Sequence, residues 1–150
     1  MVNNIIDIEV NIYTDGACRG NPGPGGWGAL LVYGKNKKKI KGFSQNTTNN
    51  IMELTAAVES LKQLKRSCKI TVTTDSVYVK NGITIWIDNW KKRGWKTSNK
   101  KDVKNKELWI ALDKECSKHS IKWEWVKGHS GHPENEIADM LANEAIDNNI

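Results

Sequence analysis

The amino-acid sequence predicts an α/β fold, with one mixed sheet and helices packed on both of its faces. Three observations predict it. In the first third of the chain, alternating apolar and polar residues indicate half-buried strands. Next, apolar residues spaced three and four positions apart indicate an amphipathic helix. From there onward, helix and strand patterns alternate. The 150 residues, 38% hydrophobic and 27% charged, match one globular domain. We therefore expect five strands, three antiparallel and then two parallel.

Three antiparallel strands are predicted first. Isoleucine and valine alternate with polar residues from Ile6 to Ile12, a period-two pattern that leads into Thr14-Asp15-Gly16. A turn rich in glycine and proline at residues 20–26 separates this strand from an apolar run at residues 27–33. A third strand at residues 39–44 follows a short turn, so it is expected to pair with the second as a hairpin.

An amphipathic helix of about four turns is predicted to begin at Ile51. Its apolar residues recur at spacings of three and four, and Asn50 is a suitable N-cap. A short strand around Ile70 and Val72 follows. It ends at Thr74-Asp75-Ser76, which repeats the chemistry of Thr14-Asp15-Gly16.

The second half of the chain alternates between helix and strand. Helical patterns cover residues 76–80 and 83–92 and, after a basic loop, residues 105–118. Residues 121–125 alternate as the last strand, and a closing helix with proline in its first turn is predicted over residues 133–147. The helices between the last strands are expected to act as crossovers that make those strands parallel.

Positive charge is concentrated in two segments. Residues 16–52 carry six basic residues and no acid before Glu53, and residues 80–106 carry nine basic residues against two acids. The segments sum to +6 and +7, so a net charge of +6 leaves −7 for the rest of the chain. This pattern favours a polyanionic partner, although a solvated lysine-rich surface explains such charge runs equally well.

The composition points away from membranes and export. No apolar run approaches the roughly 18 residues of a membrane span. Asp7 and Glu9 interrupt the segment in which a signal peptide needs continuous apolar residues. The three cysteines are far apart and form no metal-binding pair, so reduced thiols are expected. We expect a cytoplasmic protein.

Two glycine-containing motifs are excluded as cofactor or nucleophile sites. Residues 23–28 match the dinucleotide pattern G-x-G-x-x-G, but an apolar strand follows instead of a helix, and no acid occurs before Glu53. Residues 128–132 lack the final glycine of a nucleophile elbow. The histidines His129 and His132 lack further zinc ligands at a suitable spacing.

Acidic residues give the stronger functional signal. Asp15 and Asp75 each end a strand, and parallel strands would bring both to the sheet edge where α/β proteins bind ligands. The local alternatives are a helix cap for Glu53 and a solvated surface acid for Asp139. Carboxylates ~4 Å apart repel by about 4 kcal/mol per pair at an effective dielectric of 20. Four that converge therefore need a cation, and all-oxygen ligands favour Mg²⁺.

Five separated motifs closely resemble those of bacterial type 1 ribonuclease H. They are Thr14-Asp15-Gly16, GNPGPGG at residues 20–26, TTNNIMEL at residues 47–54, Thr74-Asp75-Ser76 and WVKGHSGHPEN at residues 125–135. The resemblance runs in order over nearly the whole chain. It implies the ribonuclease H-like fold and a single ribonuclease H catalytic domain over residues 1–150.

The resemblance also implies an activity, the hydrolysis of the RNA strand of RNA–DNA hybrids to 5′-phosphate and 3′-hydroxyl ends. The family uses two Mg²⁺ ions, with Mn²⁺ as a substitute. One ion activates a water, and the other stabilises the leaving oxygen. The metal-binding carboxylates fall on Asp15, Glu53, Asp75 and Asp139, with Asp15 bridging both ions. The family's loop histidine falls on His129, which is suited to moving protons or helping product leave.

The family's hybrid-binding residues can be assigned in the same way. They fall on Cys18, Asn21, Asn49 and Asn50, with a phosphate pocket at Thr48 and Asn105 and a basic protrusion that includes Trp86, Trp90, Lys91 and Lys92. Two residues depart from the family pattern: Val77, where relatives often carry glutamine, and Asp88, an acid within the protrusion. Trp123 and Trp125, on an alternating strand, are expected in the core.

Two other functions stay open from the sequence. A related metal-dependent nuclease acting on DNA branches would use the same carboxylates, and a non-catalytic hybrid-binding module would keep the basic segments. The expected partner in the leading interpretation is the RNA–DNA hybrid, with no membrane, no obligate protein partner and a monomeric state.

Overall fold

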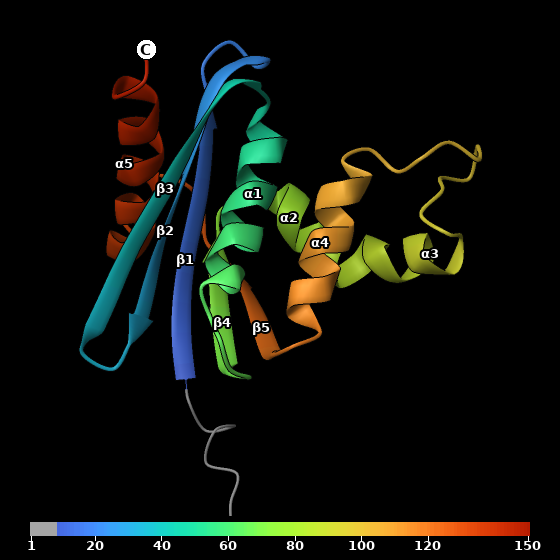
Figure 1. Cartoon of the computed structure of the whole chain (residues 1–150), viewed down its shortest axis with the longest axis horizontal. Coiled ribbons are helices and arrows are strands. Elements are labelled where there is room, and N and C mark those ends of the chain that lie inside the picture. The colour runs from blue at the N-terminus through green and yellow to red at the C-terminus, as the bar shows by residue number, and fades with distance from the viewer. Residues whose placement is uncertain (1–8) are drawn as a thin grey trace, which may run out of the picture.

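The computed structural model describes residues 9–150, which contain one five-stranded sheet with strand order β3-β2-β1-β4-β5 (Figure 1). The strands are β1 (Glu9–Cys18), β2 (Gly23–Tyr33), β3 (Asn36–Thr47), β4 (Lys69–Thr74) and β5 (Ser120–Trp125). The first three pair antiparallel, whereas β4 pairs parallel with both β1 and β5. The predicted mixed sheet is confirmed.

Helices cover both faces of this sheet. α5 (Pro133–Asp147) packs on β1, β2 and β3, while α1 (Asn49–Lys62) packs on β1 and β2 and contacts α4 (Lys106–Cys116). Figure 1 shows α5 on one side of the strands and α1 with α4 on the other. Between β4 and α4 the chain forms α2 (Val77–Asn81), a π-helical segment η2 (Gly82–Trp86) and α3 (Ile87–Lys92). No helix within residues 9–150 is both long and apolar enough to span a membrane.

The main core lies between the sheet and the layer of α1 and α4. Alternate residues of β1 point into it, so Ile12 is completely buried. Leu54 and Leu61 supply the apolar face of α1, and Trp109 and Leu112 that of α4. Burying large aliphatic and aromatic side chains of this kind contributes roughly 1.5–3 kcal/mol each, which fixes α1 against the strands that carry the acids.

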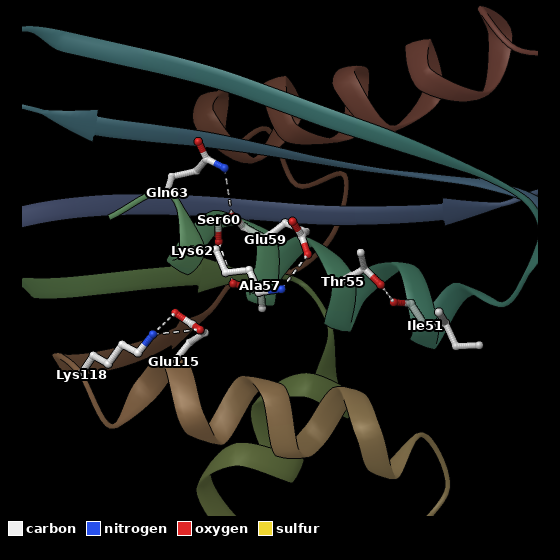
Figure 2. Close-up of polar contacts among 9 residues, drawn as sticks. All are labelled: Ile51, Thr55, Ala57, Glu59, Ser60, Lys62, Gln63, Glu115 and Lys118. Atoms are coloured by element: carbon white, nitrogen blue, oxygen red, sulfur yellow. Dashed lines mark hydrogen bonds and ion pairs between the residues drawn. The ribbon is translucent and has the colours of Figure 1, made fainter. Parts of the chain in front are cut away.

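Thr48, rather than Asn50, caps the first helix. Thr48 has an extended backbone, and its side chain accepts a hydrogen bond from the Ile51 N–H at 3.2 Å. Asn50 already lies inside the helix, so the predicted N-cap was wrong by two residues. Figure 2 shows that polar side chains farther along α1 bond to its own backbone: Thr55 donates to the Ile51 carbonyl and buried Ser60 to the Ala57 carbonyl.

The glycine-rich stretch is mostly strand, whereas a turn was predicted. Residues 23–26 belong to β2, and the turn is confined to residues 19–22. The reason is the close approach of α5: a Cβ at Gly26 would collide with the Ala142 carbonyl oxygen, and one at Gly28 would lie 2.5 Å from the Ala138 carbonyl oxygen. These glycines let a helix backbone rest directly on the sheet.

Several predicted boundaries also shift. β3 begins before residue 39 and extends beyond residue 44, because pairing with the long β2 continues along the hairpin. α4 ends at Cys116 rather than at residue 118. Trp123 is half-buried against the core as expected, but Trp125 is 42% exposed, because its indole N–H turns outward to the Asp75 carbonyl. The predicted strand residues Ile6 and Ile8 lie outside the described residues.

Candidate active site

Asp15 and Asp75 lie side by side because their strands are parallel neighbours. Thr14 of β1 is in register with Thr74 of β4, and the two aspartates are the next residues along the chain. Asp15 is buried, and the Gly16 N–H donates to its Oδ1 at 2.9 Å. The predicted proximity of Asp15 and Asp75 is confirmed. The predicted strand end at Asp15 was wrong, because β1 continues to Cys18 by pairing with β2 after its parallel pairing with β4 has ended.

Glu53 reaches the same point from α1. Its side chain is 5% exposed, and one carboxylate oxygen each of Asp15, Glu53 and Asp75 lie within 4.8 Å of one another. Oε1 of Glu53 and Oδ1 of Asp75 are buried and have no hydrogen-bond partner within the described chain. A helix-capping role therefore does not describe Glu53, because its carboxylate faces the strands and Thr48 performs the capping.

Asp139 completes the cluster from the opposite face of the sheet. It lies on α5, and its side chain is within hydrogen-bonding reach of Asp15. The alternative of an isolated surface acid is therefore wrong for Asp139. All four carboxylates line one solvent-open pocket.

Burial and mutual repulsion raise the pKa of two of these acids. Burial is the largest cause of the rise in the pKa of Asp15 to about 9, and the charges of Asp75 and Asp139 add to it. The Gly16 N–H opposes the shift. Burial, and then the charge of Asp15, raise the pKa of Glu53 well above its ordinary value. Without a cation the cluster therefore holds protons at neutral pH.

The donor set fits a hard divalent cation. All the converging ligands are carboxylate oxygens, two of them unpartnered within residues 9–150, and oxygen ligands of this kind suit Mg²⁺ or Mn²⁺. A cation would favour the ionised carboxylates and supply the missing partners of the buried oxygens.

His129 lies at the mouth of the acidic pocket, on the loop between β5 and α5. It is exposed and has a left-handed backbone, with φ of 56°. The neighbouring Gly128 lies against Asp75, since a Cβ there would be 2.8 Å from Asp75 Oδ2. The loop therefore places an imidazole beside the acids, as the sequence predicted.

Some of the predicted hybrid-binding residues border the acids. Cys18 and Asn49 line the same pocket. The Asn21 side chain accepts a hydrogen bond from the Asn49 N–H at 2.9 Å, and Cys18 Sγ donates to the Thr47 carbonyl at 3.3 Å. These contacts join the turn after β1 to the start of α1, where Thr48 caps the helix and Asn50 is half-buried.

The predicted phosphate-pocket and protrusion residues lie elsewhere. Within residues 9–150, the lining of the acidic pocket includes neither Asn105 nor any residue of the protrusion. Asn105 precedes α4 with φ of 60° and donates to the Tyr78 hydroxyl. In the described part of the chain, no direct hydrogen bond joins Asn105 to Thr48.

The protrusion combines an aromatic cluster with exposed lysines. The rings of Trp86 and Trp90 pack against one another at a tilt, and Tyr78 and Trp109 complete the cluster, with neighbouring ring centroids 5.3–6.1 Å apart. Lys91 pairs with Asp113 at 3.3 Å, and Lys92 is exposed. Val77 is 53% exposed, and Asp88 is exposed on α3, which continues directly from η2.

Asn143 is a further residue of the site, one that was not predicted from the sequence. It lines the acidic pocket, and its side-chain Nδ2 donates to the Asp139 backbone carbonyl at 3.0 Å and lies 3.4 Å from Asp139 Oδ1. Its position four residues after Asp139 on a predicted helix is the signal that could have identified it, since such residues are neighbours on a helix surface.

Comparisons with known proteins identify the family of the chain. The RNase H family model matches residues 7–147. The ribonuclease H of Hydrogenovibrio crunogenus is 66% identical over 139 residues, covering 93% of this chain and 96% of that protein. That of Coxiella burnetii is 62% identical over 138 residues, covering 92% and 90%.

Solved structures show the same relationship. The type 1 enzyme LC9-RNase H1 superimposes with a TM-score of 0.86 at 32% identity, covering 95% of this chain and 74% of that one. LC11-RNase H1, solved in complex with an RNA/DNA hybrid, gives a TM-score of 0.71 at 25% identity, covering 93% and 97%. The chain therefore belongs to the ribonuclease H family of metal-dependent endonucleases.

Proposed function

We propose that this chain hydrolyses the RNA strand of RNA–DNA hybrids, using two divalent cations held by Asp15, Glu53, Asp75 and Asp139. The observation that carries the proposal is the convergence of these carboxylates in one solvent-open pocket of a ribonuclease H-family chain. A relative of similar fold has been solved with an RNA/DNA hybrid, which supports the same substrate class here.

Asp15 is the central residue of this proposal. It is buried and feels the charges of both Asp75 and Asp139, so it is the carboxylate best placed to be shared between two cations. Bound Mg²⁺, or Mn²⁺ as a substitute, would supply an activated water and neutralise the charge that develops on the phosphate. Glu53, Asp75 and Asp139 would provide the remaining protein oxygens.

His129 is the proposed proton-transfer residue. Its exposed imidazole lies beside the acids, and histidine is the side chain that most often transfers protons in enzymes. In the hydrolysis, the water oxygen would bond to phosphorus while the bond from phosphorus to the 3′ oxygen breaks. A proton taken from the water and one given to the leaving 3′ oxygen would then leave 5′-phosphate and 3′-hydroxyl ends. In this proposal the carboxylates hold the cations, and His129 transfers protons.

Substrate choice is assigned to the turn after β1 and the start of α1. Cys18 and Asn49 line the acidic pocket, Asn21 accepts a hydrogen bond from the Asn49 N–H, and Asn50 follows Asn49 in the first turn of α1. Such groups suit a minor groove whose RNA strand carries 2′-hydroxyl groups. Thr48 and Asn105 are proposed to hold a phosphate, and Trp86, Trp90, Lys91 and Lys92 to contact the DNA strand.

Residues 1–150 are proposed to form one catalytic domain that works as a cytoplasmic monomer without an obligate protein partner. Sequence preference should be weak, because the proposed contacts address sugar and phosphate more than base edges.

A cleavage assay on matched substrates tests this function. Labelled RNA–DNA hybrid, double-stranded RNA, double-stranded DNA and branched DNA are each incubated with and without Mg²⁺, with Asp15→Asn as the inactive control. We expect Mg²⁺-dependent cleavage of the RNA strand of the hybrid alone. Cleavage of the branched DNA would support a different nuclease, and hybrid binding without cleavage would support a non-catalytic module.

A further inference from the structure

Arg19, Asn143 and Asp147 form a polar chain behind Asp139. Asn143 Nδ2 donates to the Asp139 backbone carbonyl at 3.0 Å and approaches Asp139 Oδ1 at 3.4 Å. On its other side, Arg19 NH2 lies 3.4 Å from Asn143 Oδ1, and Arg19 NH1 pairs with Asp147 Oδ1 at 2.7 Å. One guanidinium therefore bridges two α5 residues that are one helical turn apart.

The charge of Arg19 selects the orientation of the Asn143 amide. A guanidinium has five donors and no acceptor, so only the amide oxygen can face it favourably. The amide NH₂ group must then point the other way, toward Asp139. In the flipped orientation two donors would oppose each other at Arg19 and two acceptors would oppose each other at Asp139, so Arg19 fixes which end of Asn143 the carboxylate meets.

A donor fixed in this way restrains Asp139. Asp139 comes from a helix on the opposite face of the sheet from Glu53 and is the acid outside the tight group of Asp15, Glu53 and Asp75. A hydrogen bond to one carboxylate oxygen reduces the rotamer freedom that the side chain would otherwise lose on binding a cation. The carboxylate is then held ready for the ion.

We propose that Asn143 is a positioning residue that presents Asp139 to the metal, and that Arg19, itself held by Asp147, sets the Asn143 amide. This inference rests on the proposed function, because it takes Asp139 as a metal ligand. It also links the end of β1 and the turn after it, which carry Cys18 and Asn21, to the acid contributed by α5.

Mg²⁺ binding to the substrate-free protein tests the inference without relying on activity. Binding is measured by titration calorimetry and by the Mg²⁺-dependent rise in Tm for Asn143→Ala, Asn143→Leu, Arg19→Ala and the double variant Arg19→Ala/Asn143→Ala. Met140→Ala, at an exposed residue of the same helix, is the matched control. Asp139→Asn is included to test the ligand itself.

Both Asn143 variants should raise the Mg²⁺ Kd by about 3- to 10-fold, the range for loss of one hydrogen bond to a partly exposed carboxylate. Arg19→Ala should raise it less. The double variant should be no worse than Asn143→Ala, because Arg19 acts through Asn143. The side-chain amide resonances of Asn143 should also shift in Arg19→Ala.

The outcomes separate the two proposals. If Asp139→Asn leaves Mg²⁺ binding unchanged, the ligand assignment in the proposed function fails. If Asp139→Asn weakens binding but both Asn143 variants match Met140→Ala, the positioning role is overturned. It is also overturned if the effects of Arg19→Ala and Asn143→Ala simply add, since independent effects would mean that Arg19 does not act through Asn143.

Discussion

Asp15 illustrates how the surroundings of a single residue set its chemistry. The side chain is buried between like charges, and the Gly16 N–H is the backbone donor that supports its ionised form. Folding therefore has to bury a carboxylic acid that prefers to keep its proton. The same arrangement favours a cation, because a divalent ion can replace that proton and relieve the repulsion.

Replacing Asp15 with Asn should abolish hydrolysis and stabilise the metal-free protein. The amide oxygen can still accept from the Gly16 N–H. Asn also removes the free-energy cost of protonating, on folding, an acid that is ionised in the unfolded chain. Tm without metal should rise by about 2–4 °C for each kcal/mol of this cost that is removed. Cleavage rate and metal-free Tm are measured together, and a variant that keeps a substantial fraction of wild-type activity would refute the role of Asp15 as a ligand.

Replacing His129 with Ala should lower kcat by about 10- to 1,000-fold with little change in KM, the effect expected for loss of a proton-transfer group. Because His129 has a positive φ, Ala also introduces backbone strain. His129→Asn is the matched control, since Asn tolerates this conformation. Both variants should lose activity equally. Wild-type rates for either variant from pH 6 to 9 would mean that His129 is an ordinary loop residue.

At the scale of elements, the position of α5 depends on the glycines of β2. Without side chains on Gly26 and Gly28, the helix backbone approaches the strand closely, and this approach brings Asp139 to Asp15. Stability and the geometry of the site are thus connected through a single helix–strand contact.

Gly28→Ala should destabilise the protein by about 1–3 kcal/mol, the usual cost of overpacking, because the new methyl group would meet the Ala138 carbonyl oxygen and the Leu141 Cβ. It should also lower activity by displacing Asp139. Gly34→Asn is the control, because Gly34 has open space and a positive φ that Asn tolerates. Urea unfolding and kcat are measured. Loss of stability with unchanged kcat would mean that the packing of α5 on β2 does not control the position of Asp139.

The protrusion should contribute salt-sensitive binding. Lys91 and Lys96 form exposed ion pairs with Asp113 and Asp102, which are weak enough to exchange for phosphates. Replacing Lys91, Lys92 and Lys96 with Ala should raise KM with little change in kcat. It should also flatten the slope of log affinity against log salt by up to about 0.9 for each phosphate that the variant no longer neutralises.

The matched control for this prediction replaces Lys35, Lys37 and Lys39, which lie at the β2–β3 hairpin, with Ala and removes the same net charge. Affinity for the hybrid is measured at several salt concentrations. If the control loses as much affinity as the protrusion variant, the effect comes from net charge. An unchanged salt slope in the protrusion variant would mean that these three lysines are only solvated surface.

Elements with a strong periodic pattern could be predicted from sequence, and tertiary contacts explain the errors. The alternation in β1 and the apolar spacing of α1 depend on local sequence, and both elements form as expected. The glycines of residues 23–26 suggest a turn because sequence shows their conformational freedom but not the helix that covers them. The N-cap error arises because Thr48 and Asn50 are both good caps locally.

The sequence could predict those site residues whose positions depend on the parallel strands or on recognisable motifs. Asp15 and Asp75 could be placed together from the parallel arrangement alone. The convergence of Glu53 and Asp139 could not be derived from periodicity, because they come from helices on opposite faces of the sheet. The spacing of Asn143 from Asp139 was visible in the sequence, but its contact with Arg19, which is 124 residues away, was not.

At the scale of the whole molecule, the acid cluster couples stability to pH. The pKa of Asp15 is about 9 in the folded protein and about 3.9 in an unfolded chain. Between these values the folded state holds a proton that the unfolded state has released. The free energy of unfolding contributed by Asp15 therefore falls as pH rises through this window.

Metal-free wild-type protein should thus lose stability, relative to Asp15→Asn, between about pH 4 and pH 9. The comparison with Asp15→Asn is needed because other groups also change the free energy of unfolding with pH. Burial lowers the pKa of His119, for example, so the contribution of His119 to that free energy rises with pH. Excess Mg²⁺ should reduce the difference between the two proteins. Urea unfolding across this pH range measures it, and parallel curves without metal would contradict the raised pKa.

The edge strand β3 also affects how copies of this molecule meet. It is twelve residues long and lies at one end of the sheet, so its outer backbone groups could pair with a strand from another chain. Four lysines, at positions 37, 38, 39 and 41, project from it. Lys41 pairs with Glu144 at 3.2 Å, but two such edges brought together would still place the other three lysines of each chain close to one another, so these lysines oppose edge-to-edge aggregation. Part of the basic charge that suggested a polyanionic partner thus has a second physical role, in keeping concentrated protein in solution.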